Sequence, residues 1–119
     1  MSSWYRLELD VVLPIKPNEI IVQRIGRIES MLDDTVGKDF DPETHWIDNT
    51  VQPITCHVNF HAEFKLSGEE IEDVIDNACR AIWVANGEYC KIQPQWLYLE
   101  AVPWEACPRG EEDYKRLLE

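Results

Sequence analysis

The segment PITCHVNFHAEFKL, residues 53–66, contains three residues whose types could do chemistry: Cys56, His57 and His61. Cysteine and histidine are the usual zinc ligands, and a Cys/His pair also serves as nucleophile and base in several classes of enzyme. The same segment alternates between apolar and polar residues throughout, which is the pattern of a β-strand with one buried face. The direction in which each side chain points decides between these interpretations.

Neighbouring side chains on a strand point to opposite faces. Cys56 therefore belongs to the apolar face, and both histidines belong to the polar face. Residues four apart on a strand are about 13 Å apart, so His57 and His61 cannot hold one ion between them. We expect a core strand with Cys56 as a small buried residue and two half-exposed histidines, and we predict neither a metal site nor a cofactor.

Catalysis by these residues is not favoured. Cys56 and His57 lie on opposite faces, and the many carboxylates of the chain would raise the pKa of a thiol rather than lower it. The sequence contains no G-x-S-x-G, no Gly-rich phosphate loop and no H-E-x-x-H motif. We therefore predict a protein that is not an enzyme.

The chain has 119 residues, which suits one domain, and a net charge of -12 from 11 basic and 23 acidic residues. Direct binding to a nucleic-acid backbone requires Lys and Arg to replace counterions, so this balance disfavours it. An acidic protein suits a protein partner with a basic surface.

The four cysteines form no C-x-x-C pair, and the N-terminus has no apolar run like that of a signal peptide. A reduced, cytoplasmic setting is the expectation that follows. No apolar segment approaches the roughly 20 residues needed to cross a bilayer, so no membrane span is expected.

Two helices are predicted between strands. In residues 18–34 apolar residues recur at spacings of three and four, with Pro17 suited to the first turn and Arg24 and Arg27 off the apolar stripe. The second helix is marked by the capping box of Ser67 and Glu70 and by a second apolar stripe, and it ends at residues 86–87, the pair Asn-Gly.

Four strands complete the pattern. Residues 4–13 and 54–66 show the longest alternations, residues 44–51 form a short edge strand, and residues 95–102 form the last strand. The order strand, helix, strand, strand, helix, strand predicts an α+β fold of the ferredoxin-like type, βαββαβ, with an antiparallel sheet and both helices on one face. We expect residues 1–103 to form this single domain and residues 104–119 to be a short helical tail that packs on it.

The helix-free face of such a sheet is the first candidate binding surface. Exposed aromatic rings among charges are typical of interfaces. A partner or a second copy of the chain could dock here, unless the tail covers the face. The residues expected on it are Trp4, Arg6, Glu8, Asp10, His57, Asn59, His61, Glu63 and Lys65, with Trp96 and Tyr98 from the edge.

An acidic surface is the second candidate. Arrayed carboxylates can imitate nucleic-acid phosphates and so occupy a nucleic-acid-binding protein. Small acidic phage-type inhibitors of nucleic-acid-binding defence complexes act in this way, and the likeness here is one of size and charge. The acids in question are Glu69, Glu72, Asp73 and Asp76 on the second helix, with Asp33 and Asp34 near the end of the first.

We therefore predict a small acidic protein-binding module, such as an inhibitor, adaptor or assembly factor. The alternative is a small enzyme or ligand-binding domain that uses the open face around His57 and His61, with Trp4 and Trp96 sheltering the site. Both sets of residues also have an explanation that involves no site: the acids can be the solvated face of a helix, and the histidines and aromatic residues can be ordinary residues of a sheet.

Overall fold

The computed structural model describes residues 3–66, 70–98 and 104–118, which form an α+β fold with an antiparallel sheet. The helices and strands follow one another as β1 (Ser3–Pro14), α1 (Ile21–Val36), β2 (Asp41–Asp48), β3 (Thr55–Leu66), α2 (Ile71–Asn86), β4 (Lys91–Tyr98), β5 (Glu105–Ala106) and α3 (Glu111–Leu118).

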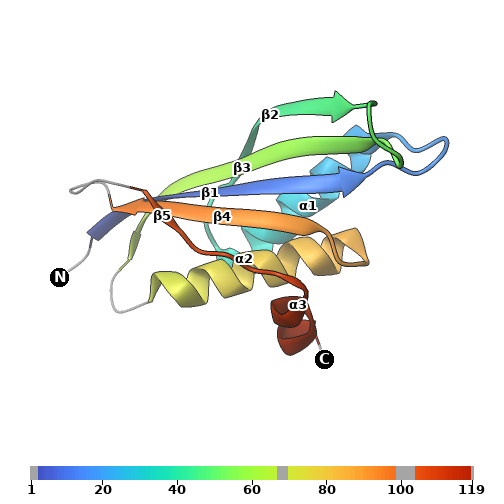
Figure 1. The fold of residues 1–119 in the computed structure, drawn as a ribbon. Coiled ribbons are helices and arrows are strands. Elements are labelled where there is room, and N and C mark those ends of the chain that lie inside the picture. Colours follow the sequence, from blue (N-terminus) through green and yellow to red (C-terminus); the bar gives the residue numbers. More distant parts are fainter. Residues whose placement is uncertain (1–2, 67–69, 99–103, 119) are drawn as a thin grey trace.

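Within these residues the strands form one sheet of order β2-β3-β1-β4-β5, and every pairing is antiparallel. Figure 1 shows α1 and α2 on the same side of the sheet, with α3 beyond α2. The opposite side of the sheet, which we call the open face, carries no helix. The fold therefore has two layers, with the core between sheet and helices.

The prediction for residues 53–66 is confirmed over β3. Its buried and partly exposed positions alternate along the strand, with Cys56 fully buried and both His57 and His61 on the open face. β1 alternates in the same way, and its buried residues, Leu7 to Leu13, pack on the helices. In both strands, apolar and polar residues alternate because one face of the strand is buried and the other is not.

Helix α1 begins at Ile21, later than Pro17 suggests. Asn18 has φ of +63°, a left-handed conformation that belongs to a turn and not to a helix. The helix ends at Gly37, whose φ of +75° lets its N–H bond the carbonyl of Asp33. The expectation that Arg24 lies off the buried stripe is wrong, because its side chain is 3% exposed.

Helix α2 begins at Ile71, and the residue before it, Glu70, makes no side-chain capping bond. Ser67, the other half of the predicted capping box, lies outside the described residues. The predicted stop is confirmed: Gly87 adopts φ of +83° and donates its N–H to the carbonyl of Trp83.

The second and fourth predicted strands start several residues earlier than expected. β2 ends at Asp48 because its carboxylate accepts the N–H of Thr50, which forms a turn. β4 starts at Lys91, opposite Val12 of β1, whereas the sequence predicts a strand that begins at Gln95.

The C-terminal segment runs along the edge of the sheet and then onto the helix layer. β5 pairs with β4, and Ile92 forms a further bridge with Arg109 in the same register. The ring of Tyr114 in α3 then packs edge-on against Trp83 at 5.4 Å and Tyr89 at 5.6 Å. The described part of the tail therefore lies beside the open face and not over it.

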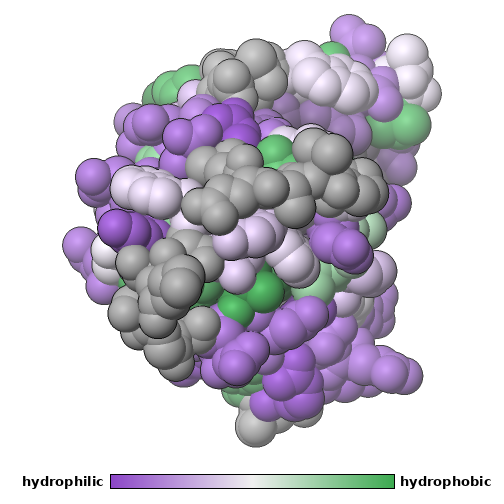
Figure 2. Space-filling model, turned by 90° about the vertical axis from the view of Figure 1, so that its left-hand side faces the viewer, coloured by the Kyte–Doolittle hydropathy of each residue, from purple (hydrophilic) through white to green (hydrophobic). Residues whose placement is uncertain are grey.

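Hydrophilic side chains dominate the end of the molecule that Figure 2 shows, and hydrophobic colour is confined to small separate areas. Among the described residues, none of the helices is both long and apolar enough to cross a membrane.

Candidate functional site

Four rows of side chains cross the open face, because β1 pairs with β3 on one side and with β4 on the other; the row Glu63–Arg6–Leu97 lies at one end, and the other three contain the groups discussed below. Side chains in register across three strands form one row. Those three rows are His57–Val12–Lys91, Asn59–Asp10–Gln93 and His61–Glu8–Gln95.

Hydrogen bonds fix the acids at the centre of the face. Asn59 donates through Nδ2 to Glu8 Oε1 at 3.1 Å and to Asp10 Oδ1 at 2.7 Å. Arg6 donates through Nε to Glu8 Oε2 at 3.1 Å and through Nη1 to Glu63 at 3.3 Å. The central strands thus present an ordered, mostly acidic polar surface.

An aromatic stack borders the first row at the β2 edge. The rings of Trp46 and His57 lie 4.0 Å apart and are nearly parallel, at 2°. The hydroxyl of Thr55 lies 3.3 Å from His57 Nε2 and helps to hold the ring. Trp46 is nevertheless 55% exposed, so a large apolar surface faces solvent beside a polar row.

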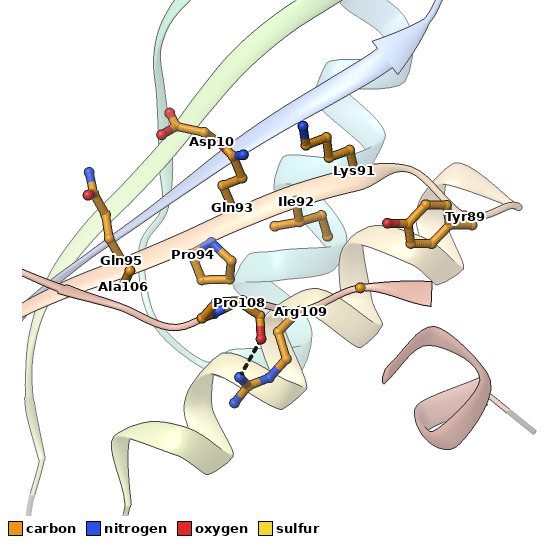
Figure 3. Close-up of a pocket in the computed structure, with 11 residues that line it drawn as sticks. Asp10, Tyr89, Lys91, Ile92, Gln93, Pro94, Gln95, Ala106, Pro108 and Arg109 are labelled. Carbon is orange, nitrogen blue, oxygen red and sulfur yellow. Dashed lines mark hydrogen bonds between the residues drawn. The ribbon is translucent and has the colours of Figure 1, made fainter. Parts of the chain in front are cut away.

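Two adjoining hollows lie along these rows. The first, of about 310 Å³, is lined by Trp46 and His57 together with parts of β1, β3 and β4. The second, of about 430 Å³, lies over β4 and the tail, and Figure 3 shows the side chains around it. Asp10, Lys91 and Gln93 line both hollows, so the two hollows are direct neighbours on the open face.

Small tail residues create the larger hollow. Ala106, Pro108 and Gly110 line it beside the longer side chains of β4. Because these tail residues are small, they leave space above the tail that longer side chains would fill. Of the residues between them, Cys107 is buried, and Arg109 lines the hollow with part of its side chain while its guanidinium reaches α2, as Figure 3 shows. A strand-like alternation of small and anchoring residues therefore shapes this part of the open face.

The predicted open-face residues divide between the two sides of the sheet. Trp4, 46% exposed, lies there with Lys65 Nζ 5.9 Å from its ring centre, and both histidines are there too. The placement of Trp96 is wrong: it lies opposite Leu7 on the helix side, where its ring contacts Tyr5 at 5.6 Å. Tyr98 is likewise opposite Tyr5, so neither ring contributes to the open face.

The predicted acidic surface is partly occupied by the chain's own arginines. Arg109 binds both Glu72 and Asp76, and Arg116 binds Asp76 at 3.1 Å. Hydrogen bonds from Arg109 and Cys107 hold the pKa of the Glu72 carboxyl below its usual range and outweigh the effect of burial, which opposes its ionisation. Asp73 remains exposed, and Glu69 lies outside the described residues.

The acids of the first helix lie in its last turn. Asp33 uses its carboxylate locally, accepting the N–H of Phe40 at 2.8 Å, and Asp34 is exposed. Among the residues that the structure describes, no three or more Cys, His, Asp or Glu side chains are grouped closely enough to hold a metal ion.

The thiols show no sign of activation. Burial raises the pKa of Cys56, and the side chains of Cys56 and His57 project to opposite faces of the sheet. Cys107 donates to the carboxylate of Glu72 at 3.2 Å, and its pKa is raised by burial and by that bond. A nucleophilic cysteine requires a lowered pKa, because the thiolate is the reactive form.

Lys91, Gln93 and Gln95 are the site residues that sequence reasoning missed. They alternate with Ile92 and Pro94, which are buried, so the signal of a half-buried strand was present in KIQPQ. The contribution of the tail had no local signal, because it depends on pairing with β4.

Comparisons of this chain with models of protein families, with curated proteins and with solved structures find no match. The arrangement of the open face therefore carries the functional argument.

Proposed function

We propose that the protein is a binding module for another protein and that the partner docks on the open face. One observation carries this proposal: no described residue covers the face opposite the helices, and it combines two hollows with the exposed ring of Trp46. Interfaces favour such rings because they bury much area and lose little side-chain entropy.

The chemistry of the face supports a protein partner over a nucleic acid. Glu8, Asp10 and Glu63 lie on its two central strands and would repel phosphates. The same carboxylates complement lysine and arginine side chains, so a partner with basic residues at its docking surface fits best. The module would then act as an inhibitor, adaptor or assembly factor.

Nucleic-acid mimicry by α2 has less support than the open face. Arg109 and Arg116 neutralise part of the charge of Glu72 and Asp76. Asp73 and Asp34 remain available to steer a basic partner during encounter.

We also propose that the four longer strands and the two helices beside them form a ferredoxin-like core. The support is the order β2-β3-β1-β4, with antiparallel pairing and two helices on one side. β5 would then be an addition at the β4 edge.

Site-specific photo-crosslinking in the native cell tests the docking surface. A photoreactive amino acid replaces Trp46 or Gln95 on the open face, and in matched variants it replaces Gln23 or Arg27, which are exposed on α1. We expect a protein crosslinked from the open-face positions, identified by mass spectrometry, and none of that protein from α1.

Crosslinks from α1 alone, or none from the open face, would overturn the proposal. The purified protein is also measured by light scattering, because a second copy is one form of partner. A crosslinked dimer of the chain itself would identify the open face as a homodimer interface, which is still docking of a protein.

A further inference from the structure

We propose that the hollow over β4 binds a small zwitterion with an apolar body, of the kind that leucine or phenylalanine represents. Its volume of about 430 Å³ lies in the range of small-molecule sites. This inference does not depend on a protein partner, since it concerns only this hollow and the groups that line it.

Two opposite charges, Asp10 and Lys91, face the hollow from neighbouring strands, and the third charged residue of its lining, Arg109, is already paired with Glu72 and Asp76. Asp10 lies opposite Gln93, and Lys91 lies opposite Val12, so the two charged residues are diagonal neighbours. Such neighbours are about 7–8 Å apart between their Cα atoms, a spacing that leaves room for a ligand's charged groups between the side chains. One charge could meet a ligand ammonium and the other a ligand carboxylate.

Both charges have unused capacity. Lys91 is exposed and forms no salt bridge with any residue that the structure describes. Asp10 accepts from Asn59 at Oδ1, and within the described residues no hydrogen bond reaches its Oδ2.

The rest of the lining suits an apolar body and its polar end. Pro108 and Ala106 offer apolar surface on the tail side, and the ring of Tyr89 borders one end. Figure 3 shows Gln93 and Gln95 beside them. An amide side chain both donates and accepts hydrogen bonds, so it can meet a carboxylate as well as an ammonium group.

Charge decides the ligand class. A net anion would be repelled by the protein's charge of -12 and would leave Asp10 unmatched, and a net cation, although attracted by that charge, would leave Lys91 unmatched. A zwitterion carries no net charge and places one group on each residue. It therefore matches the hollow better than either ion.

The test is an NMR titration of the ¹⁵N-labelled protein with three probes: leucine, N-acetyl-leucine, which lacks the ammonium, and leucine amide, which lacks the carboxylate. We expect saturable shifts of the backbone amides of Lys91, Gln93 and Gln95 with leucine, and at least tenfold weaker binding of the other two. Phenylalanine should bind like leucine.

The variants Lys91→Gln and Asp10→Asn should each weaken leucine binding at least tenfold. Lys65→Gln, on the same face but far from the hollow, is the matched control and should bind as the wild type does. Spectra without ligand verify that each variant is folded. Equal binding of all three probes, shifts away from β4, or no saturable shift with either amino acid would overturn the inference.

Discussion

Arg24 and Asn86 join the two helices beneath the sheet, through a hydrogen bond of 2.8 Å from Nη1 to Oδ1. The same guanidinium donates through Nη2 to the carbonyl of Pro14 at 2.6 Å and pairs with Glu19. One buried cation thus connects the end of β1, the following loop, α1 and the last residue of α2.

Replacing Arg24 with Met should lower the free energy of unfolding by about 3 kcal/mol, because it leaves Glu19 and Asn86 without their buried partner. Urea unfolding measures the loss. Arg27→Met, an equal change at an exposed position of the same helix, should cost less than about 0.5 kcal/mol. Equal losses in the two variants would contradict the role assigned to Arg24.

The ion pair of Glu19 should make stability depend on pH. Burial opposes ionisation of this carboxyl, but hydrogen bonds from Lys16 N–H and Arg24, with the charge of Arg24, lower its pKa overall. A lowered folded pKa stabilises the protein above the unfolded value of about 4.3, and that contribution is lost as pH falls through the folded pKa.

We therefore expect urea midpoints to fall less steeply below pH 5 in Glu19→Gln than in the wild type. Glu112→Gln, at an exposed residue of α3, should keep the wild-type slope. An unchanged slope in Glu19→Gln would show that other carboxylates carry the acid sensitivity.

The thiols of Cys79 and Cys90 should resist alkylation in the native protein. Burial raises the pKa of each to about 12, and the thiolate is the reactive form. Mass spectrometry after iodoacetamide treatment at pH 8 should show these two residues unmodified in buffer and modified in urea. Rapid labelling of either in buffer would mean that this part of the core opens readily.

The sequence predicts the central strands well because the alternation that indicates each strand lies within the residues of that strand. Alternation in β1 and β3 assigns each side chain to a face without knowledge of the rest of the chain. The face of Trp96 was assigned wrongly, since it follows from the pairing of β4 with β1. A charge pattern likewise predicts an exposed Arg24, whereas partners from three other segments allow it to be buried.

The candidate site is less predictable than the fold for the same reason. His57 could be placed on the open face from its strand alone. The hollow needs Pro108 and Gly110 beside Lys91, residues that are far apart in sequence and meet only through the tail's pairing with β4.

Two glycines should respond in opposite ways to replacement by alanine. Gly87 has φ of +83°, so Gly87→Ala should destabilise the protein by about 1 kcal/mol. Gly26 is exposed inside α1, and an added Cβ would meet no atom within 4 Å, so Gly26→Ala should stabilise it by about 1 kcal/mol. Thermal unfolding measures the change in Tm of each variant relative to the wild type. A change of the same sign in both variants would contradict the local geometry.

Asp76 should decide whether the tail stays docked on α2. Its carboxylate accepts from Arg109 at 2.8 Å and from Arg116 at 3.1 Å, and the charge-assisted bond with Arg109, which is largely buried, contributes more than an exposed pair does. Asp76→Asn should therefore speed hydrogen exchange at the amides of Cys107 and Tyr114 by about tenfold.

Asp73→Asn makes the same change of charge nearby on α2, at an exposed carboxylate, and should leave that exchange unchanged. The comparison separates the specific bonds of Asp76 from a general loss of negative charge. Equal acceleration in both variants would mean that the net charge of α2 alone holds the tail. Acceleration in neither would mean that the packing of Tyr114 on Trp83 and Tyr89 is sufficient.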